Sequence, residues 1–152
     1  MIKLTKPAFQ RLIQQLLHIE ETMEDTASFY YPDSPLEQDQ LKNFLRQYTA
    51  IVEDEFSKIQ VIHPVSKEAD TRDLNNFPYV VIGSSVVVEN LGNGALTTYT
   101  LTHSSDQSRA KNDLWYLSDT GRALLLRELD TEVKLPLQGG LERCRIKSIT
   151  LM

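Results

Sequence analysis

The chain has 152 residues, of which 41% are hydrophobic and 24% are charged, as is typical of a globular protein, and we expect it in the cytoplasm. It contains neither a run of roughly 20 apolar residues that could span a membrane nor the apolar core of a signal peptide. Its single cysteine, Cys144, excludes a cysteine-based zinc cluster. The net charge of −5 is unevenly spread. Residues 1–62 carry six basic and ten acidic side chains, whereas residues 77–152 carry eight of each. We therefore expect no strongly basic face that could bind free DNA.

Residues 1–62 are predicted to form two amphipathic helices. Hydrophobic residues recur there at alternating steps of three and four, which is the pattern of a coiled-coil seam. The seam residues are Phe9, Leu12, Leu16, Ile19 and Met23 in the first helix, and Leu41, Phe44/Leu45, Tyr48, Ile51/Val52, Phe56 and Ile59 in the second. Thr5 is expected to cap the first helix, and Ser34 to Glu37 matches a capping box that starts the second. Because two prolines separate helices of about equal length, we predict an antiparallel hairpin roughly 36 Å long.

Residues 63–76 are polar and aperiodic, and we interpret them as a linker. From residue 77 onward the pattern is that of strands, with Asn90 to Gly94 as a hairpin turn and Ser118 or Asp119 as the cap of one short helix. Strands are predicted at residues 79–82, 86–88, 96–102, 114–117, 133–135 and 144–151. The predicted fold is therefore α+β, with an antiparallel coiled-coil hairpin over residues 1–62 and an antiparallel β domain over residues 77–152.

Four short segments follow one another in a characteristic order. They are Gln60-Val61-Ile62 after the second helix, a V-x-x-G-x-x-V pattern that runs to Asn90-Leu91, Leu117-Ser118 followed by Gly121 to Leu124, and Val133 to Glu142 followed by the strand Cys144 to Leu151. Together they resemble the GreA/GreB family of transcript-cleavage factors over nearly the whole chain. The resemblance implies an FKBP-like C-terminal domain that docks beside the secondary channel of bacterial RNA polymerase, and a coiled-coil arm that enters the channel.

The resemblance also implies acidic residues at the tip of the arm. In the family these side chains help the polymerase to hold a second Mg²⁺, an ion that prefers carboxylate and phosphate oxygens. The candidates here are Asp33, Glu37 and Asp39, although the family's tip glycine is absent and Asp33 and Glu37 are four residues apart instead of three. Capping of the second helix is the alternative role of these carboxylates. The factor itself would be no enzyme and would carry no cofactor of its own.

The segment from Trp115 to Arg122 is the surface that the resemblance implies for docking to the polymerase. Ser118, Asp119 and Arg122 are its candidate polar contacts, and Asp119 stands where the family usually has proline. Trp115 is either part of this surface or a core residue. The arm is also a few turns shorter than the family's cleavage-competent arms, and each missing turn withdraws the tip by about 5.4 Å.

Three functions remain open. The first is an elongation factor that binds RNA polymerase at the secondary channel, contacts nascent RNA only indirectly and stimulates cleavage of backtracked transcripts. The second is a non-catalytic channel binder similar to Rnk or anti-Gre homologues, which the short arm favours. The third is a coiled-coil, FKBP-like interaction module unrelated to transcription. For the first two we expect a monomer.

Overall fold

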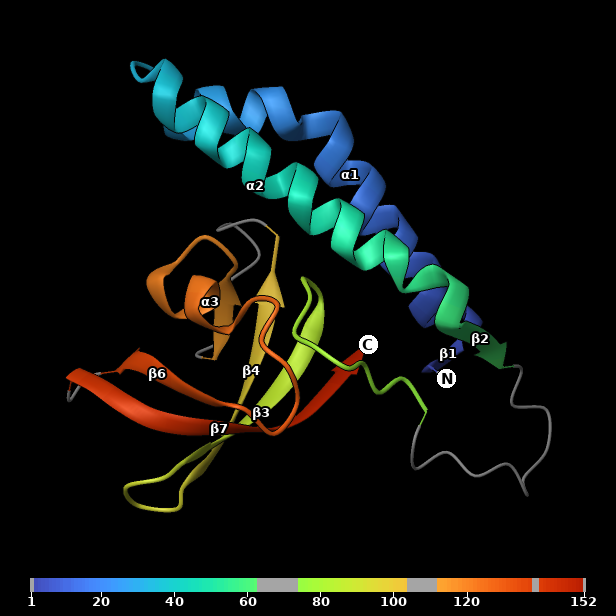
Figure 1. The fold of residues 1–152 in the computed structure, drawn as a ribbon, viewed down its shortest axis with the longest axis vertical. Coiled ribbons are helices and arrows are strands. Elements are labelled where there is room, and N and C mark those ends of the chain that lie inside the picture. Colours follow the sequence, from blue (N-terminus) through green and yellow to red (C-terminus); the bar gives the residue numbers. More distant parts are fainter. Residues whose placement is uncertain (1, 63–73, 104–111, 138–139, 152) are drawn as a thin grey trace.

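The computed structural model describes residues 2–62, 74–103, 112–137 and 140–151, and it joins a helical hairpin to a curled β-sheet (Figure 1). Its elements are β1 Ile2–Thr5, α1 Lys6–Tyr30, α2 Pro35–Asp54, the 3-10 helix η1 Phe56–Lys58, β2 Ile59–Ile62, β3 Ser84–Asn90, β4 Leu96–Thr102, β5 Asp113–Trp115, α3 Asp119–Leu124, β6 Glu132–Leu137 and β7 Gly140–Leu151. The predicted α+β class is confirmed. Among the described helices, none combines the length and the apolar character needed to cross a membrane. Most of the predicted linker, residues 63–73, lies outside the described residues.

Helices α1 and α2 run antiparallel, side by side (Figure 1). Both begin where the sequence indicates, because the Thr5 side chain accepts a hydrogen bond from the Ala8 N–H and the Ser34 side chain accepts one from the Glu37 N–H, each at 3.3 Å. The Ser34 N–H donates to the Tyr31 carbonyl instead of to the Glu37 side chain. The buried seam residues are Leu12, Leu16, Ile19 and Met23 in α1, and Leu41, Leu45, Tyr48 and Val52 in α2.

The second helix ends earlier than its hydrophobic pattern suggests. It stops at Asp54, and the chain then passes through η1 into β2, which pairs in parallel with β1 in the register Ile2 to Ile59. The ring of Phe56, predicted as a seam residue of the helix, lies in η1 and meets the ring of Phe9 edge to face at 5.7 Å. A two-stranded sheet that the sequence analysis did not predict therefore closes the base of the hairpin.

The β domain is a five-stranded sheet in the order β5-β4-β3-β7-β6. Three of its four pairings are antiparallel, as predicted, but β4 and β5 are parallel, so the sheet is mixed. A parallel pair cannot be joined by a tight hairpin turn, and β4 and β5 are accordingly further apart in the chain than such a turn allows. Pro136 lies in β6, an edge strand of the sheet, which is where proline is tolerated within a strand.

The predicted strand at residues 79–82 is buried but is not a strand. Val80, Val81 and Ile82 are almost completely inaccessible. The Ser84 hydroxyl donates to the Val81 carbonyl at 2.6 Å and accepts from the Val81 N–H, which closes a tight turn at Gly83, where φ is 91°. The segment pairs with residues 126–129 only through an isolated antiparallel bridge between Tyr79 and Glu128 and the backbone hydrogen bonds beside it, so its β-branched residues mainly reflect burial in the core.

The hairpin lies across the β domain, with one hydrophobic core running through both (Figure 1). Two hydrogen bonds join the hairpin to the β domain. The Ile82 N–H donates to the Tyr48 hydroxyl at 2.9 Å, and the Tyr79 hydroxyl donates to the Ile51 carbonyl at 3.1 Å. Gly83 also lies at this junction, where the end of the Gln15 side chain packs against it, and its φ of 91° is a conformation that glycine adopts far more readily than other residues.

Asn75 joins the base of the hairpin to the last strand. Its side-chain oxygen accepts from the Thr5 N–H at 2.8 Å, its own N–H donates to the Lys3 carbonyl, and its carbonyl accepts from the Leu151 N–H at 2.7 Å. Asn75 has a φ of 65°, a left-handed conformation that asparagine tolerates better than most residues. One residue therefore ties β1, the start of α1 and β7 together.

Candidate partner-binding site

The tip of the hairpin lies against the predicted docking segment. The ring of Tyr30, at the end of α1, stacks at a tilt of 38° on the ring of Trp115, with 4.8 Å between the ring centres. Trp115 is half-buried, and its indole Nε1 is buried without a hydrogen-bond partner among the described residues. Trp115 is therefore neither a plain core residue nor an open contact, because the arm covers part of it.

Of the other three docking candidates, two are on the surface. Asp119 and Arg122 are exposed at the two ends of α3. Ser118 is occupied as the helix cap: its hydroxyl donates to the Trp115 carbonyl at 2.7 Å and accepts from the Gly121 N–H at 3.1 Å. We therefore assign Ser118 to the positioning of α3, while Asp119 and Arg122 are free to meet a partner.

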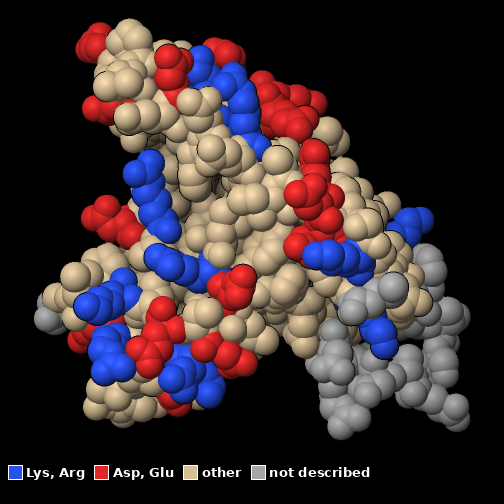
Figure 2. Space-filling model, viewed as in Figure 1, with Lys and Arg blue, Asp and Glu red and all other residues tan. Residues whose placement is uncertain are grey.

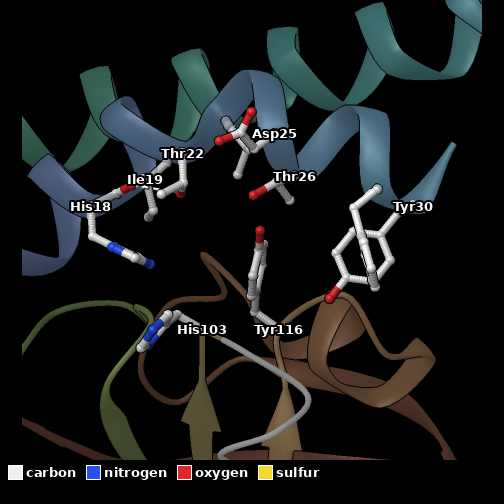
Figure 3. Close-up of a pocket in the computed structure, with 10 residues that line it drawn as sticks. His18, Ile19, Thr22, Asp25, Thr26, Tyr30, His103 and Tyr116 are labelled. Atoms are coloured by element: carbon white, nitrogen blue, oxygen red, sulfur yellow. Dashed lines mark hydrogen bonds between the residues drawn. The ribbon is translucent and has the colours of Figure 1, made fainter. Parts of the chain in front are cut away.

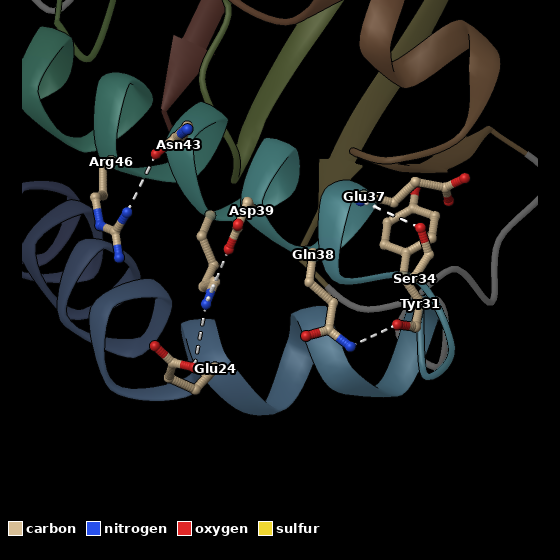
Figure 4. Close-up of polar contacts among 9 residues, drawn as sticks. Glu24, Tyr31, Ser34, Glu37, Gln38, Asp39, Asn43 and Arg46 are labelled. Carbon is tan, nitrogen blue, oxygen red and sulfur yellow. Dashed lines mark hydrogen bonds and ion pairs between the residues drawn. The ribbon is translucent and has the colours of Figure 1, made fainter.

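The three tip carboxylates are exposed, but they do not share one site. Asp39 pairs with Lys42 at 3.6 Å, and the same ammonium group reaches Glu24 at 3.4 Å, so Lys42 ties the two helices together (Figure 4). Asp33 lies in the turn between the helices, and Glu37 lies over the first turn of α2 beside the groove described below. Within the described ranges no three His, Cys, Asp or Glu side chains are grouped so that they could hold a metal ion.

Two hollows flank the contact between Tyr30 and Trp115. The larger, of about 540 Å³, separates α1 from the body, and its polar wall includes His18, Asp25 and Tyr116 (Figure 3). The rings of His18 and His103 meet across it edge to face, at 4.8 Å. Burial, and next the neighbouring His18, hold the pKa of His103 below its ordinary value. Burial raises the pKa of Tyr116 to about 12, and its hydroxyl points toward Thr26 (Figure 3).

The second hollow is a groove of about 420 Å³ between the start of α2 and α3. Tyr31, Leu41 and Phe44 give it an apolar wall, and Glu37 and Arg122 bring opposite charges to it. One tip candidate and one docking candidate, which the sequence analysis assigned to different parts of the molecule, therefore line the same groove.

The apex of the hairpin carries two large apolar side chains that the sequence analysis missed. Phe29 is 77% exposed and Leu36 is 69% exposed. Both fall outside the coiled-coil seam, and both lie next to the turn that contains Pro32. In Figure 2 this end of the hairpin, at the upper left, is mostly uncharged surface with acidic groups beside it. Large apolar residues off the seam were the signal that could have identified them.

Solved structures resemble this chain over almost its whole length. The crystal structure of GreA factor homolog 1 (Gfh1) of Thermus thermophilus is 20% identical, with 97% of each chain covered and a TM-score of 0.44. Gfh1 of Thermus aquaticus is 21% identical, with 98% of this chain and 97% of that chain covered and a TM-score of 0.44. A prokaryotic transcription elongation factor GreA/GreB from Nitrosomonas europaea is 20% identical, with 99% of each chain covered and a TM-score of 0.46. No curated protein sequence gives a significant match.

The family assignment follows from the β domain. Residues 76–151, half of the chain, match the family model for the C-terminal part of the transcription elongation factors GreA/GreB. The matched region includes all five strands of the main sheet and the helix α3 that carries Asp119 and Arg122. The chain belongs to the GreA/GreB family of transcription elongation factors.

Proposed function

We propose that this protein binds bacterial RNA polymerase at the secondary channel and regulates it without delivering a catalytic metal ion. The observation that carries the proposal is the GreA/GreB-type β domain, which presents Asp119 and Arg122 on its surface beside the tip of the arm. Under this proposal the protein is a cytoplasmic regulator without enzymatic activity or a cofactor of its own, and the polymerase supplies any Mg²⁺.

The arrangement of the tip supports the non-catalytic form of the proposal. Mg²⁺ requires several oxygen ligands in near-octahedral geometry. Here Asp39 is paired with Lys42, Glu37 lies beside the groove that Arg122 also lines, and Asp33 lies in the turn. Placing these carboxylates around one ion would require the tip to rearrange, whereas metal-assisted catalysis depends on accurate positioning.

The position of the arm favours a partner that contacts the tip of the hairpin and the docking segment of the β domain at the same time. Tyr30 rests on Trp115, so the tip and the docking segment lie side by side. Full insertion of the arm into a channel would require Tyr30 to leave Trp115 and the Tyr48 hydroxyl to leave the Ile82 N–H. The partner's binding energy would have to offset the loss of these contacts.

The test combines binding with a cleavage assay. The purified protein is mixed with core RNA polymerase, and stalled, backtracked complexes are then followed for transcript shortening. We expect binding, competition with an authentic GreA/GreB cleavage factor, and no shortening. Shortening that disappears in the variant Asp33→Asn with Glu37→Gln would establish the cleavage-stimulating function instead. Failure to bind the polymerase would refute the proposal and leave an interaction module unrelated to transcription.

A further inference from the structure

The apex of the hairpin exposes large apolar side chains. Phe29 and Leu36 lie on either side of the turn between α1 and α2, and Pro32 and Pro35, also exposed, lie between them. We call these four residues the apolar apex. Exposed apolar side chains that occur singly are common, whereas several of them at one end of a molecule favour an interaction site there.

A chain of aromatic rings connects Phe29 of the apolar apex to the body. The ring of Phe29 meets that of Tyr30 edge to face at 5.0 Å, Tyr30 stacks on Trp115, and Trp115 meets Tyr116 at 6.3 Å. Phe29 is therefore held by packing although 77% of it is exposed. A side chain that is already ordered loses less conformational entropy on binding, which favours its use as an anchor.

The helix segments that form the apex carry only negative charge, and the body brings a positive charge, Arg122, to the groove beside Glu37. Residues 19–41 contain seven acidic residues and no lysine, arginine or histidine. The first basic residue beyond them, Lys42, is already engaged with Glu24 and Asp39. A partner that binds here must therefore offer an apolar pocket to Phe29 and Leu36. It must also offer positively charged side chains to the acidic residues around the apex.

We propose that the apolar apex inserts into an apolar pocket with a basic rim on a protein partner, with Phe29 and Leu36 as the anchoring residues. This inference rests on the proposed function for the identity of that partner, RNA polymerase. It gives the tip carboxylates the role of guiding association by charge in place of metal delivery.

Other occupants fit this surface less well. A second copy of the chain offers no basic excess, because residues 77–152 carry eight basic and eight acidic side chains. Anionic membranes attract clusters of basic residues, and the acidic surroundings of the apex would be repelled. A metal ion lacks a converging set of ligands among the described residues.

The experiment compares exposed apolar residues at two places on the full-length protein. Affinity for core RNA polymerase is measured for the wild type, Phe29→Ala, Leu36→Ala, the double variant, and Leu141→Ala as the matched control. Leu141 is 71% exposed but lies on β7, outside the apex. Because all three side chains are exposed, we expect unchanged circular dichroism and unchanged melting temperatures. Each apex substitution should weaken binding by about tenfold or more, as anchoring residues of interfaces do, and the control should bind as the wild type does.

The outcomes separate the two proposals. If the wild type binds and the double variant binds equally well, the anchoring role of the apolar apex is refuted and the proposed function stands. If the wild type does not bind, the proposed function and the partner named here both fail. If the chain associates with itself and the double variant abolishes that association, a second copy is the occupant and the inference is overturned. A further variant, Asp33→Asn with Glu37→Gln, should slow association mainly at low salt, since exposed charges are screened at high ionic strength.

Discussion

The ring of Tyr30, the last residue of α1, stacks on the ring of Trp115, the last residue of β5, at 4.8 Å. This contact links the tip of the arm to the segment from Trp115 to Arg122, which we propose as the docking surface. Trp115 is the only tryptophan of the chain, so its fluorescence reports directly on whether the arm lies against the body.

Replacing Tyr30 with alanine should expose the indole of Trp115. We expect the emission of Trp115 to shift to longer wavelength and its quenching by acrylamide to increase. The free energy of unfolding should fall by about 0.5–1.5 kcal/mol for the lost ring contact, in addition to the area that the tyrosine buries. Leu36→Ala, an exposed apex residue, is the control and should leave the emission unchanged. An unchanged spectrum in Tyr30→Ala would mean that the arm does not rest on Trp115 in solution.

Removing the Tyr48 hydroxyl should weaken the junction between arm and body. In Tyr48→Phe the buried Ile82 N–H loses its hydrogen-bond partner, so we expect a loss of about 1–3 kcal/mol in urea denaturation. Tyr79→Phe serves for comparison, because the Tyr79 hydroxyl donates to the Ile51 carbonyl in a site that is only partly buried. Its loss should be smaller, about 0.5–1.5 kcal/mol. A larger loss in Tyr79→Phe than in Tyr48→Phe would contradict this view of the junction.

Two buried tyrosines predict instability at high pH. Burial raises the pKa of Tyr116 to about 12 and holds the pKa of Tyr48 even further above its ordinary value. The folded state thus favours the neutral hydroxyls, whereas in the unfolded chain tyrosine ionises near pH 10. Stability should therefore be insensitive to these groups below about pH 10 and should fall as the pH rises from there toward 12. Urea midpoints across this range should fall less steeply for Tyr116→Phe than for the wild type.

The histidine pair predicts a weaker contact between arm and body at low pH. Burial and the neighbouring His18 lower the pKa of His103. In the unfolded chain His103 takes up a proton near pH 6.5, and in the folded protein only at lower pH. The contribution of His103 to stability is therefore complete above about pH 6.5 and is lost as the pH falls through the folded pKa. The stability difference between the wild type and His103→Gln should change across this range, and a constant difference would refute the prediction.

The sequence predicted the parts of the fold that depend on neighbouring residues. The seam from Leu12 to Met23 is visible because apolar residues one helical turn apart share a face. The caps at Thr5, Ser34 and Ser118 were predicted for the same reason, since each side chain bonds a backbone N–H three residues ahead. Such signals lie within a few positions of one another in the chain.

What could not be predicted depends on residues far apart in the chain. The pairing of β1 with β2 joins Ile2 to Ile59, and the parallel pairing of β4 with β5 sets Thr102 beside Trp115. Tyr48 belongs to the seam by its spacing, yet its hydroxyl bonds Ile82 in the body. The candidate site shows the same limit. Its residues were identified one by one, but no local pattern indicates that the tip and the docking segment touch.

The junction at Asn75 limits how this protein can be recombined with its relatives. The backbone and side chain of Asn75 bond to Lys3, Thr5 and Leu151, which belong to both halves of the molecule. A chimaera that grafts a foreign coiled coil onto this β domain would leave the Ile82 N–H without Tyr48 and the surface at Gly83 without Gln15. The hairpin and the β domain therefore cannot be exchanged independently of each other. A stable chimaera must keep Tyr48 and Gln15 together with the segment that contains Ile82 and Gly83.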